Sequence, residues 1–304
     1  MQTEFYTFGE ILWDCLPSGR HVGGAPFNVA AHLVQLGTSA TLISAIGKDP
    51  LGDEILQAAT EKRVNTEIIR RHPTLPTGTV IVKINEKGNA TYDIVEPVAW
   101  DEIEVSPETV EAVAQASGFV FGSLSCRSEH NIKALDALLD LQGPMKFFDV
   151  NLRPPYADPE RVVKLAARAD VLKMNHEEVG QLAAYVQTGD TACDEPLDTD
   201  SVARAAAVVA EKTDTPIICV TRAENGAALW DRGTMVISPA PQVKVKDTVG
   251  AGDSFMAGLM FGLTNKMDAR AVVANACRVG AFVASHHGAT PVLPNDIKNA
   301  FAIE

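Results

Sequence analysis

The sequence has no uninterrupted apolar run near the 18 residues that a membrane-spanning helix needs. Its first residues, MQTEFYTFGE, contain no basic segment followed by an apolar core, so they do not indicate a secretory signal. Cationic residues are also in deficit, because 26 lysines and arginines face 39 aspartates and glutamates, for a net charge of −13. We therefore expect a cytoplasmic protein without nucleic-acid or membrane partners. A local basic pocket can still bind an anionic substrate.

Several site motifs are missing as well. The five cysteines are scattered and form no C-x-x-C, which argues against a zinc or disulfide framework and favours free thiols: Cys15, Cys126, Cys193, Cys219 and Cys277. A Walker A sequence is absent, which excludes a P-loop kinase. No G-x-G-x-x-G follows the first strand, which argues against a dinucleotide-dependent oxidoreductase. The pair His286–His287 has no third ligand at a suitable spacing, so we expect no zinc site there.

What remains is ordinary globular composition, with 46% hydrophobic and 21% charged residues over 304 positions. Four short apolar segments are typical of strands covered on both faces: Gly118–Leu124, Met145–Val150, Ala169–Met174 and Pro216–Thr221. Helical patterns separate or follow them: Glu129–Leu141, Pro159–Arg168, His176–Tyr185 and Ser201–Lys212. This alternation predicts a parallel sheet with right-handed crossovers.

A second pattern interrupts the first. At Thr79–Ile94, TVIVKI and ATYDI flank NEKGN, which predicts an antiparallel hairpin. Phe5–Leu16 is also strand-like, and we expect both segments to form a small β appendage. The polar, acidic stretch Gln187–Asp200 reads as a surface loop. We predict one domain over residues 1–304, with a lid subdomain at about 9–22 and 76–98.

The segment Asp247–Phe255, DTVGAGDSF, carries the most chemistry. Two glycines beside an acid at the start of an apolar helix indicate an anion hole, because free N–H groups and the positive helix end attract phosphate. Gly250 and Gly252 allow close approach of the backbone. Asp253 then has two interpretations: an ordinary acid in the first turn of a helix, or a base that accepts a proton from an alcohol.

The string D-T-V-G-A-G-D resembles the second signature of the PfkB carbohydrate kinases, also called the ribokinase family. The resemblance runs from Gly9 to Pro291. It implies a ribokinase-like fold of class α/β: a Rossmann-like, mainly parallel sheet flanked by helices, with a small β-sheet lid. It also implies that Asp253 is the catalytic base and that the backbone of Gly250, Ala251 and Gly252 stabilises the transferred phosphoryl group. The hairpin then matches the family's lid, which keeps water from the phosphoryl group.

The same resemblance assigns the sugar side. GGAPFN matches the other family signature, with Gly23 and Gly24 as bare backbone and Asn28 as a partner for sugar hydroxyls. Asp14 matches the aspartate that binds two hydroxyls. Arg153 is either a contact to substrate or product phosphate, or a surface ion pair. The strings GEILWD, GGAPFNVA and FDVNLRPPY are most similar to bacterial fructokinases within the family.

The nucleotide side follows from two further motifs. NHEE resembles N-x-x-E, which implies that Asn175 and Glu178 organise Mg²⁺ and phosphate through water, although an N-cap with first-turn acids explains them equally. TRAENG matches T-x-G-x-x-G with Thr221 and Gly226, but Ala223 stands where glycine is usual. Asn275 lies where relatives border adenine; its alternative is an ordinary polar residue of a helix.

The family also suggests a monovalent cation, such as potassium, beside the anion hole. It is held mainly by main-chain carbonyls, at these positions: Asp247, Val249, Val283, His286 and Gly288. A serine that is common four residues later is Val292 here.

Together these motifs predict ATP- and Mg²⁺-dependent phosphorylation of a sugar hydroxyl, with D-fructose to fructose 6-phosphate as the favoured reaction. One alternative is a kinase for another sugar, such as 2-keto-3-deoxygluconate, whose carboxylate would pair with Arg153. Another is a catalytically silent sugar-binding regulator, which the intact Asp253 and GAG argue against. We also expect a homodimer that forms through the lid, since exposed sheet edges invite pairing.

Overall fold

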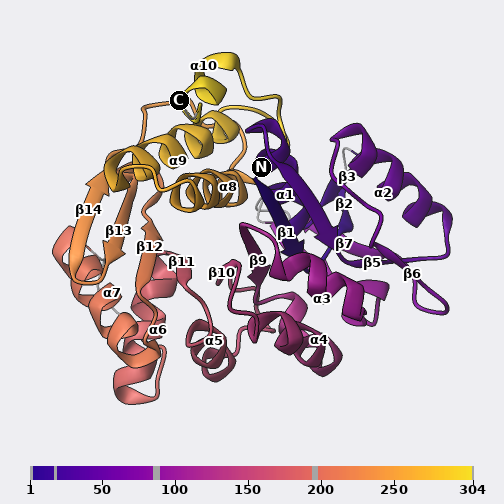
Figure 1. The fold of residues 1–304 in the computed structure, drawn as a ribbon, viewed down its shortest axis with the longest axis horizontal. Coiled ribbons are helices and arrows are strands. Elements are labelled where there is room, and N and C mark those ends of the chain that lie inside the picture. The colour runs from indigo at the N-terminus through magenta and orange to yellow at the C-terminus, as the bar shows by residue number, and fades with distance from the viewer. Residues whose placement is uncertain (1–2, 17–18, 85–89, 194–197, 303–304) are drawn as a thin grey trace.

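A computed structural model describes residues 3–16, 19–84, 90–193 and 198–302. Its centre is an eight-stranded sheet flanked by helices (Figure 1). The strands, in sheet order, are β14 (Thr234–Ser238), β13 (Ala227–Asp231), β12 (Ile217–Thr221), β11 (Val171–Asn175), β10 (Met145–Asp149), β9 (Gly118–Gly122), β1 (Glu4–Phe8) and β4 (Ser39–Ile43). Pairing is parallel from β4 to β12 and antiparallel at β13 and β14. The four segments predicted as buried strands are confirmed.

Helices cover both faces of this sheet. One face carries α1 (Ala25–Gln35), α8 (Ala251–Thr264) and α9 (Ala269–Ala284), with α10 (Asn295–Asn299) packed outside α9. The other carries α3 (Pro107–Ala114), α4 (Glu129–Leu139), α5 (Pro159–Ala166), α6 (His176–Thr188) and α7 (Thr199–Thr213). Successive strand residues alternate between these two cores, as a two-residue side-chain period requires: Phe147 packs with α8, and Phe148 packs on the opposite side. The four predicted helices are confirmed.

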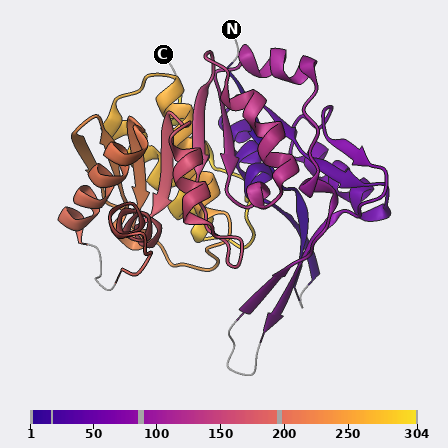
Figure 2. The same ribbon diagram turned by 90° about the horizontal axis from the view of Figure 1, so that it is seen from below.

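A smaller sheet projects from the body (Figure 2). Its strand order is β3 (Gly19–Gly23), β2 (Leu12–Leu16), β7 (Gly78–Ile84) and β8 (Ala90–Ile94). The antiparallel pairing of β7 with β8 confirms the predicted hairpin, whose NEKGN turn lies outside the described residues. A further pair, β5 (Ala45–Gly47) with β6 (Arg70–His72), and α2 (Pro50–Glu61) lie at the base of this sheet. Three short 3₁₀ turns complete the fold: η1 (Ala99–Asp101), η2 (Ser125–Arg127) and η3 (Ala223–Asn225).

One expectation is wrong in part. Phe5–Leu16 does not form a single element of the appendage, because β1 lies in the main sheet between β4 and β9 and only β2 enters the small sheet. The chain changes direction at Gly9, whose φ of 141° is rare for other residues. The side chains of Phe5 and Phe8 are fully buried, which fixes β1 in the body.

The predicted loop at Gln187–Asp200 is shorter than expected, since α6 continues to Thr188 and α7 begins at Thr199. Of the helices within the described ranges, none is long and apolar enough to cross a membrane.

Candidate active site

The first residues of α8 offer backbone N–H groups as hydrogen-bond donors. Gly250 precedes the helix with a φ of 78°, and a Cβ there would lie 2.6 Å from the Cα of Ala289, so only glycine fits. Among the described residues, no side chain caps this helix. The first-turn N–H groups of Gly252 and Asp253 can therefore bind an anion, with the positive end of the helix behind them. These donors lie at the segment for which the sequence predicts an anion hole.

Asp253 lies in the first turn of this helix, half-buried. Asn28, from α1, donates from Nδ2 to Asp253 Oδ2 at 2.8 Å. Burial, with the nearby charge of Asp149, raises the pKa of Asp253 to about 6, while Asn28 and Lys173 act in the opposite direction. A carboxyl with this pKa is mostly ionised at neutral pH and close enough to it to accept a proton effectively.

Asn28 therefore orients Asp253. Its side chain was predicted to contact sugar hydroxyls, and the structure gives its amide nitrogen to the carboxylate instead. The Oδ1 atom of the same amide is buried and has no hydrogen-bond partner in the described part of the chain. It is the one acceptor of Asn28 still available to a hydroxyl donor.

Asp14 and the glycine pair, which the sequence predicts to bind sugar, meet at the start of α1. A Cβ on Gly23 would lie 2.1 Å from Oδ2 of Asp14, and a Cβ on Gly24 would lie 2.4 Å from the carbonyl oxygen of Glu10. These contacts require glycine at both positions and bring the β2 carboxylate against the start of α1. Burial raises the pKa of Asp14 to about 6, although His21 and Arg153 lower it.

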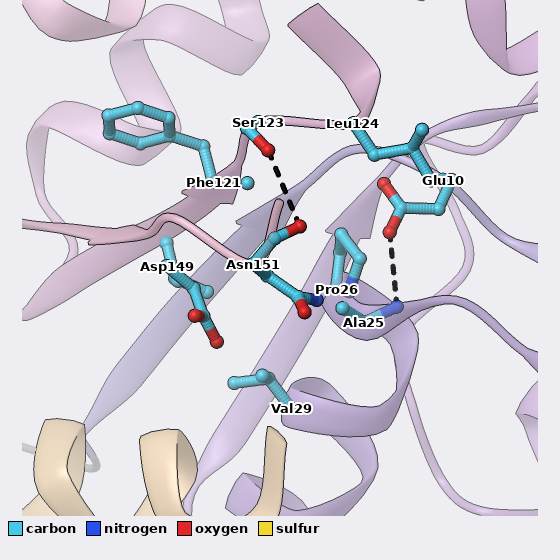
Figure 3. A pocket seen from close by; sticks show the side chains of 11 residues that line it. Glu10, Ala25, Pro26, Val29, Phe121, Ser123, Leu124, Asp149 and Asn151 are labelled. Carbon is cyan, nitrogen blue, oxygen red and sulfur yellow. Dashed lines mark hydrogen bonds between the residues drawn. The ribbon is translucent and has the colours of Figure 1, made fainter. Parts of the chain in front are cut away.

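Glu10 is a buried acid that sequence reasoning did not assign. It accepts from the backbone N–H of Ala25 at 3.2 Å, and its other oxygen has no partner among the described residues. Burial raises its pKa to about 7, against the effect of the Ala25 N–H. Glu10 and Asp149 line one pocket, on either side of Asn151 (Figure 3). The signal was present in GEILWD, where only the second acid was assigned.

Lys173 was also missed. Its ammonium donates to both carboxylate oxygens of Asp149 at 2.9 Å, and both side chains are buried. The sequence feature that could have identified Lys173 is a lysine within the apolar segment ADVLKM. Asp149 is the last residue of β10, at the carboxyl end of the strand, where open α/β sheets bind ligands.

Arg153 is exposed, and its Nη1 donates to the carbonyl oxygen of Leu152 at 3.1 Å. Its positive charge lowers the pKa of Glu10, Asp14 and Asp253, against the larger effect of burial. The hydrogen bond that the described residues give Arg153 goes to a main-chain oxygen and not to a carboxylate, so the surface ion pair considered from the sequence is not seen among them.

On the neighbouring strand ends, Asn175 and Glu178 form a reciprocal cap of α6. Asn175 Oδ1 accepts from the Glu178 N–H, and Glu178 Oε2 accepts from the Asn175 N–H, both at 2.8 Å. Glu178 Oε1 also accepts from the N–H of Leu152 at 2.8 Å. The N-cap interpretation is therefore satisfied. Each carboxylate oxygen of Glu178 keeps a further acceptor site, which a water ligand of Mg²⁺ could use.

Thr221 pairs with Asn175 across β11 and β12, so the two nucleotide motifs lie side by side. Ala223 has a φ of 48°, in the left-handed region that favours the glycine expected there. Gly226 closes the same turn through its N–H to the Ala223 carbonyl oxygen at 3.1 Å. Asn275, on α9, donates to the carbonyl oxygen of Ala300 at 2.8 Å, which ties α10 to α9.

The candidate cation loop is held together by Asp247. Its two oxygens accept from the N–H groups of Val249 and Gly288, each at 3.0 Å. The N–H of His286 donates to the carbonyl oxygen of Val283 at 2.9 Å. Within the described ranges, no group of three His, Cys, Asp or Glu side chains could hold a metal ion.

Comparison with known proteins now adds to this geometry. The model of the pfkB family carbohydrate kinases matches residues 13–296. A fructokinase of Escherichia coli is 26% identical over 316 residues, which cover 97% of each chain. A fructokinase of Xylella fastidiosa with bound ATP has a TM-score of 0.81 at 23% identity, covering 99% of this chain and 98% of its own. A 2-dehydro-3-deoxygluconokinase of Thermotoga maritima has the same TM-score and coverage at 22% identity.

These two structures share the fold of this chain equally, so the fold does not select between their substrates. The family match spans nearly the whole chain and includes Asp14, Asn28 and Asp253. The chain belongs to the PfkB family of carbohydrate kinases.

Proposed function

We propose that this sugar kinase transfers the γ-phosphoryl group of ATP to the primary hydroxyl of D-fructose. The observation that carries the proposal is the position of Asp253, half-buried beside uncapped backbone donors and oriented by Asn28. Its carboxylate takes the hydroxyl proton while the sugar oxygen bonds to the γ-phosphorus. The bond from that phosphorus to the bridging oxygen breaks, and its electron pair leaves with ADP. The proton then passes from Asp253 to solvent.

The charges on the sugar side favour a neutral substrate. Three carboxyls, Glu10, Asp14 and Asp253, are at least partly buried together with few compensating charges, and burial is the largest influence on the pKa of each. A neutral polyol gives these carboxylates hydroxyl donors. A sugar acid would add a further negative charge beside these three carboxyls.

A second candidate is a kinase for 2-keto-3-deoxygluconate. The observation in its favour is the exposure of Arg153, whose guanidinium donates to a main-chain oxygen and to no carboxylate among the described residues. Such a group could turn to bind a carboxylate bidentately.

The nucleotide is assigned to the strand ends that carry Asn175 and Thr221, and its phosphates to the backbone of Gly250, Ala251 and Gly252. Glu178 would hold the water ligands of Mg²⁺, which when bound neutralises phosphate charge. The small sheet would serve as a lid that excludes water. A potassium ion would bind at main-chain carbonyls of the loop that Asp247 organises.

The test is coupled ADP release with Mg–ATP against fructose, ribose, 2-keto-3-deoxygluconate, tagatose and adenosine, each with and without potassium. We expect turnover with fructose and a higher kcat/KM than with any other acceptor. Turnover restricted to the sugar acid would replace fructose by the second candidate and assign its carboxylate to Arg153. ATP binding without turnover on any acceptor would instead favour the silent regulator.

A further inference from the structure

We propose that Lys173 is an additional catalytic residue, whose buried ammonium contacts the phosphoryl group in transit, and that Asp149 positions it. The inference deepens the proposed function and rests on it. Lys173 lies outside the strings quoted above for the family resemblance, whereas Asp149 lies in one of them, FDVNLRPPY.

The ion pair is built by neighbouring strands. Asp149 and Lys173 are directly paired residues of β10 and β11, so their side chains leave the sheet on the same face. That face is the one covered by α8. Lys173 is only 6% exposed, and its Nζ lies 2.9 Å from both oxygens of Asp149.

The ammonium also lies against the anion hole. A Cβ on Gly252 would come within 3.3 Å of Lys173 Nζ, which places the cation beside the first turn of α8. Two of its three N–H donors are accounted for by Asp149, and one is left for another acceptor. An anion bound by the first-turn N–H groups would receive that donor.

This location is unfavourable for a purely structural pair. A buried ion pair seldom stabilises a fold relative to apolar residues of similar size. Here the cation also lies near the positive end of a helix, where a negative group is preferred. Both costs are offset when a phosphoryl group carrying negative charge is held between Lys173 and the helix.

Asp149 keeps the cation available. Both carboxylate oxygens of Asp149 lie 2.9 Å from Nζ, so the buried ammonium has a counter-ion in direct contact. The lysine therefore stays charged in a buried position. Because Asp149 fixes Nζ through two hydrogen bonds, the remaining donor is oriented before the substrate arrives.

The experiment compares Lys173→Met, Asp149→Asn and the double variant Lys173→Met/Asp149→Asn with the wild type. The double variant removes both charges, so it leaves no unpaired buried ion. It should therefore still fold even where Lys173→Met alone, which leaves Asp149 unpaired, does not. Lys164→Met is the matched control, since it removes one lysine from an exposed pair with Glu160. Affinities for ATP and ADP are measured by calorimetry, and kcat and the sugar KM by ADP release.

We expect both variants without Lys173 to lose on the order of 10²-fold in kcat. The preference for ATP over ADP should fall about tenfold, because the lost contact is to the terminal phosphoryl group. The sugar KM should change little. Asp149→Asn alone should retain the preference for ATP in part, and Lys164→Met in full.

A folded double variant with the wild-type kcat and the wild-type preference for ATP would overturn the role of Lys173. So would an equal loss of ATP and ADP affinity in the double variant, which indicates general damage to the site. Failure of the wild type to bind ATP would overturn the proposed function first. If the wild type binds ATP but phosphorylates none of the acceptors, the role of Lys173 is decided by comparing the affinities of the variants for ATP and for ADP.

Discussion

At the scale of single residues, the chemistry depends on Asp253. Asp253→Asn keeps the side-chain shape and can still accept from Asn28, but it cannot take a proton. We expect kcat to fall by at least about 10³-fold, in the range for loss of a general base. Thermal stability should be unchanged or higher, because burial disfavours the charged carboxylate. The ADP-release assay and a melting curve check both; activity above a few per cent would show that another group is the base.

A second consequence at this scale is the pH dependence of stability that Glu10 contributes. Its pKa is raised to about 7 from 4.5, so the folded state binds a proton that the unfolded state releases between these values. This contribution is fully present below the unfolded pKa and is lost as pH rises through 7. Relative to Glu10→Gln, the wild type should lose up to roughly 3 kcal/mol between pH 5 and pH 8.

Urea denaturation of both proteins at a series of pH values measures this difference. His32→Gln is a useful control because the pKa of His32 is lowered to about 4 by burial, which gives a slope of the opposite sign. A flat difference between wild type and Glu10→Gln would mean that Glu10 is solvated in the folded protein.

Sequence reasoning worked at this scale where one segment contains the whole feature. Gly250 and Asp253 lie within seven residues that also begin a helix, so local pattern and chemistry coincide. Lys173 and Asp149 meet across two strands, 24 positions apart. Their contact depends on strand register, which the sequence does not state. The free oxygen of Glu10 likewise depends on what packs around it.

At the scale of elements, Arg127 joins the small sheet to the body. Its guanidinium makes hydrogen bonds of 2.7 and 2.8 Å to the carboxylate of Asp101 and one of 2.9 Å to the carbonyl oxygen of Val95, just after β8. It also stacks on Trp100, with 4.0 Å from the guanidinium carbon to the ring centroid. The exit of β8 is thus fixed to the turns η1 and η2.

Arg127→Met should therefore lower the free energy of unfolding by about 3 kcal/mol, since it leaves Asp101 unpaired in a largely buried site. If the small sheet acts as a lid, the sugar KM should rise more than kcat falls. Arg168→Met is the control, because Arg168 pairs with Asp136 and Asp140 at the surface and should contribute about 1 kcal/mol or less. Equal destabilisation of the two variants would contradict the argument.

The periodicity of apolar residues predicts some elements of this fold and misses the boundary between β1 and β2. The alternation of buried strands and helices predicted β9 to β12 and α4 to α7, because each element has its own apolar pattern. Phe5–Leu16 is mostly apolar, with Gly9 and the acids Glu10 and Asp14 among the apolar residues, so the pattern did not show that β1 ends at Phe8 in one sheet and β2 begins at Leu12 in another. That division is made by tertiary packing of Phe5 and Phe8.

At the scale of the whole molecule, the small sheet presents two unlike faces. Val80 is 5% exposed and packs with Leu12, whereas the next residue, Ile81, is 40% exposed on the opposite face. A single-layer sheet gains stability when both faces are covered. A second copy of the chain, carrying the same face, would cover this one in the expected homodimer.

Ile81→Lys should therefore convert a dimer to a monomer. At a symmetric interface two ammonium groups would be buried opposite each other, and the free energy of burying them exceeds what the rest of the contact contributes. Ile237→Lys is the matched control, since Ile237 is 43% exposed on β14, at the far edge of the main sheet. Light scattering after size-exclusion chromatography gives the mass of each. A wild type that is monomeric at micromolar concentration, or an Ile81→Lys protein that stays dimeric, would remove the small sheet as the interface. If Ile81→Lys is monomeric and its sugar KM also rises, the interface supports the lid as well as the assembly.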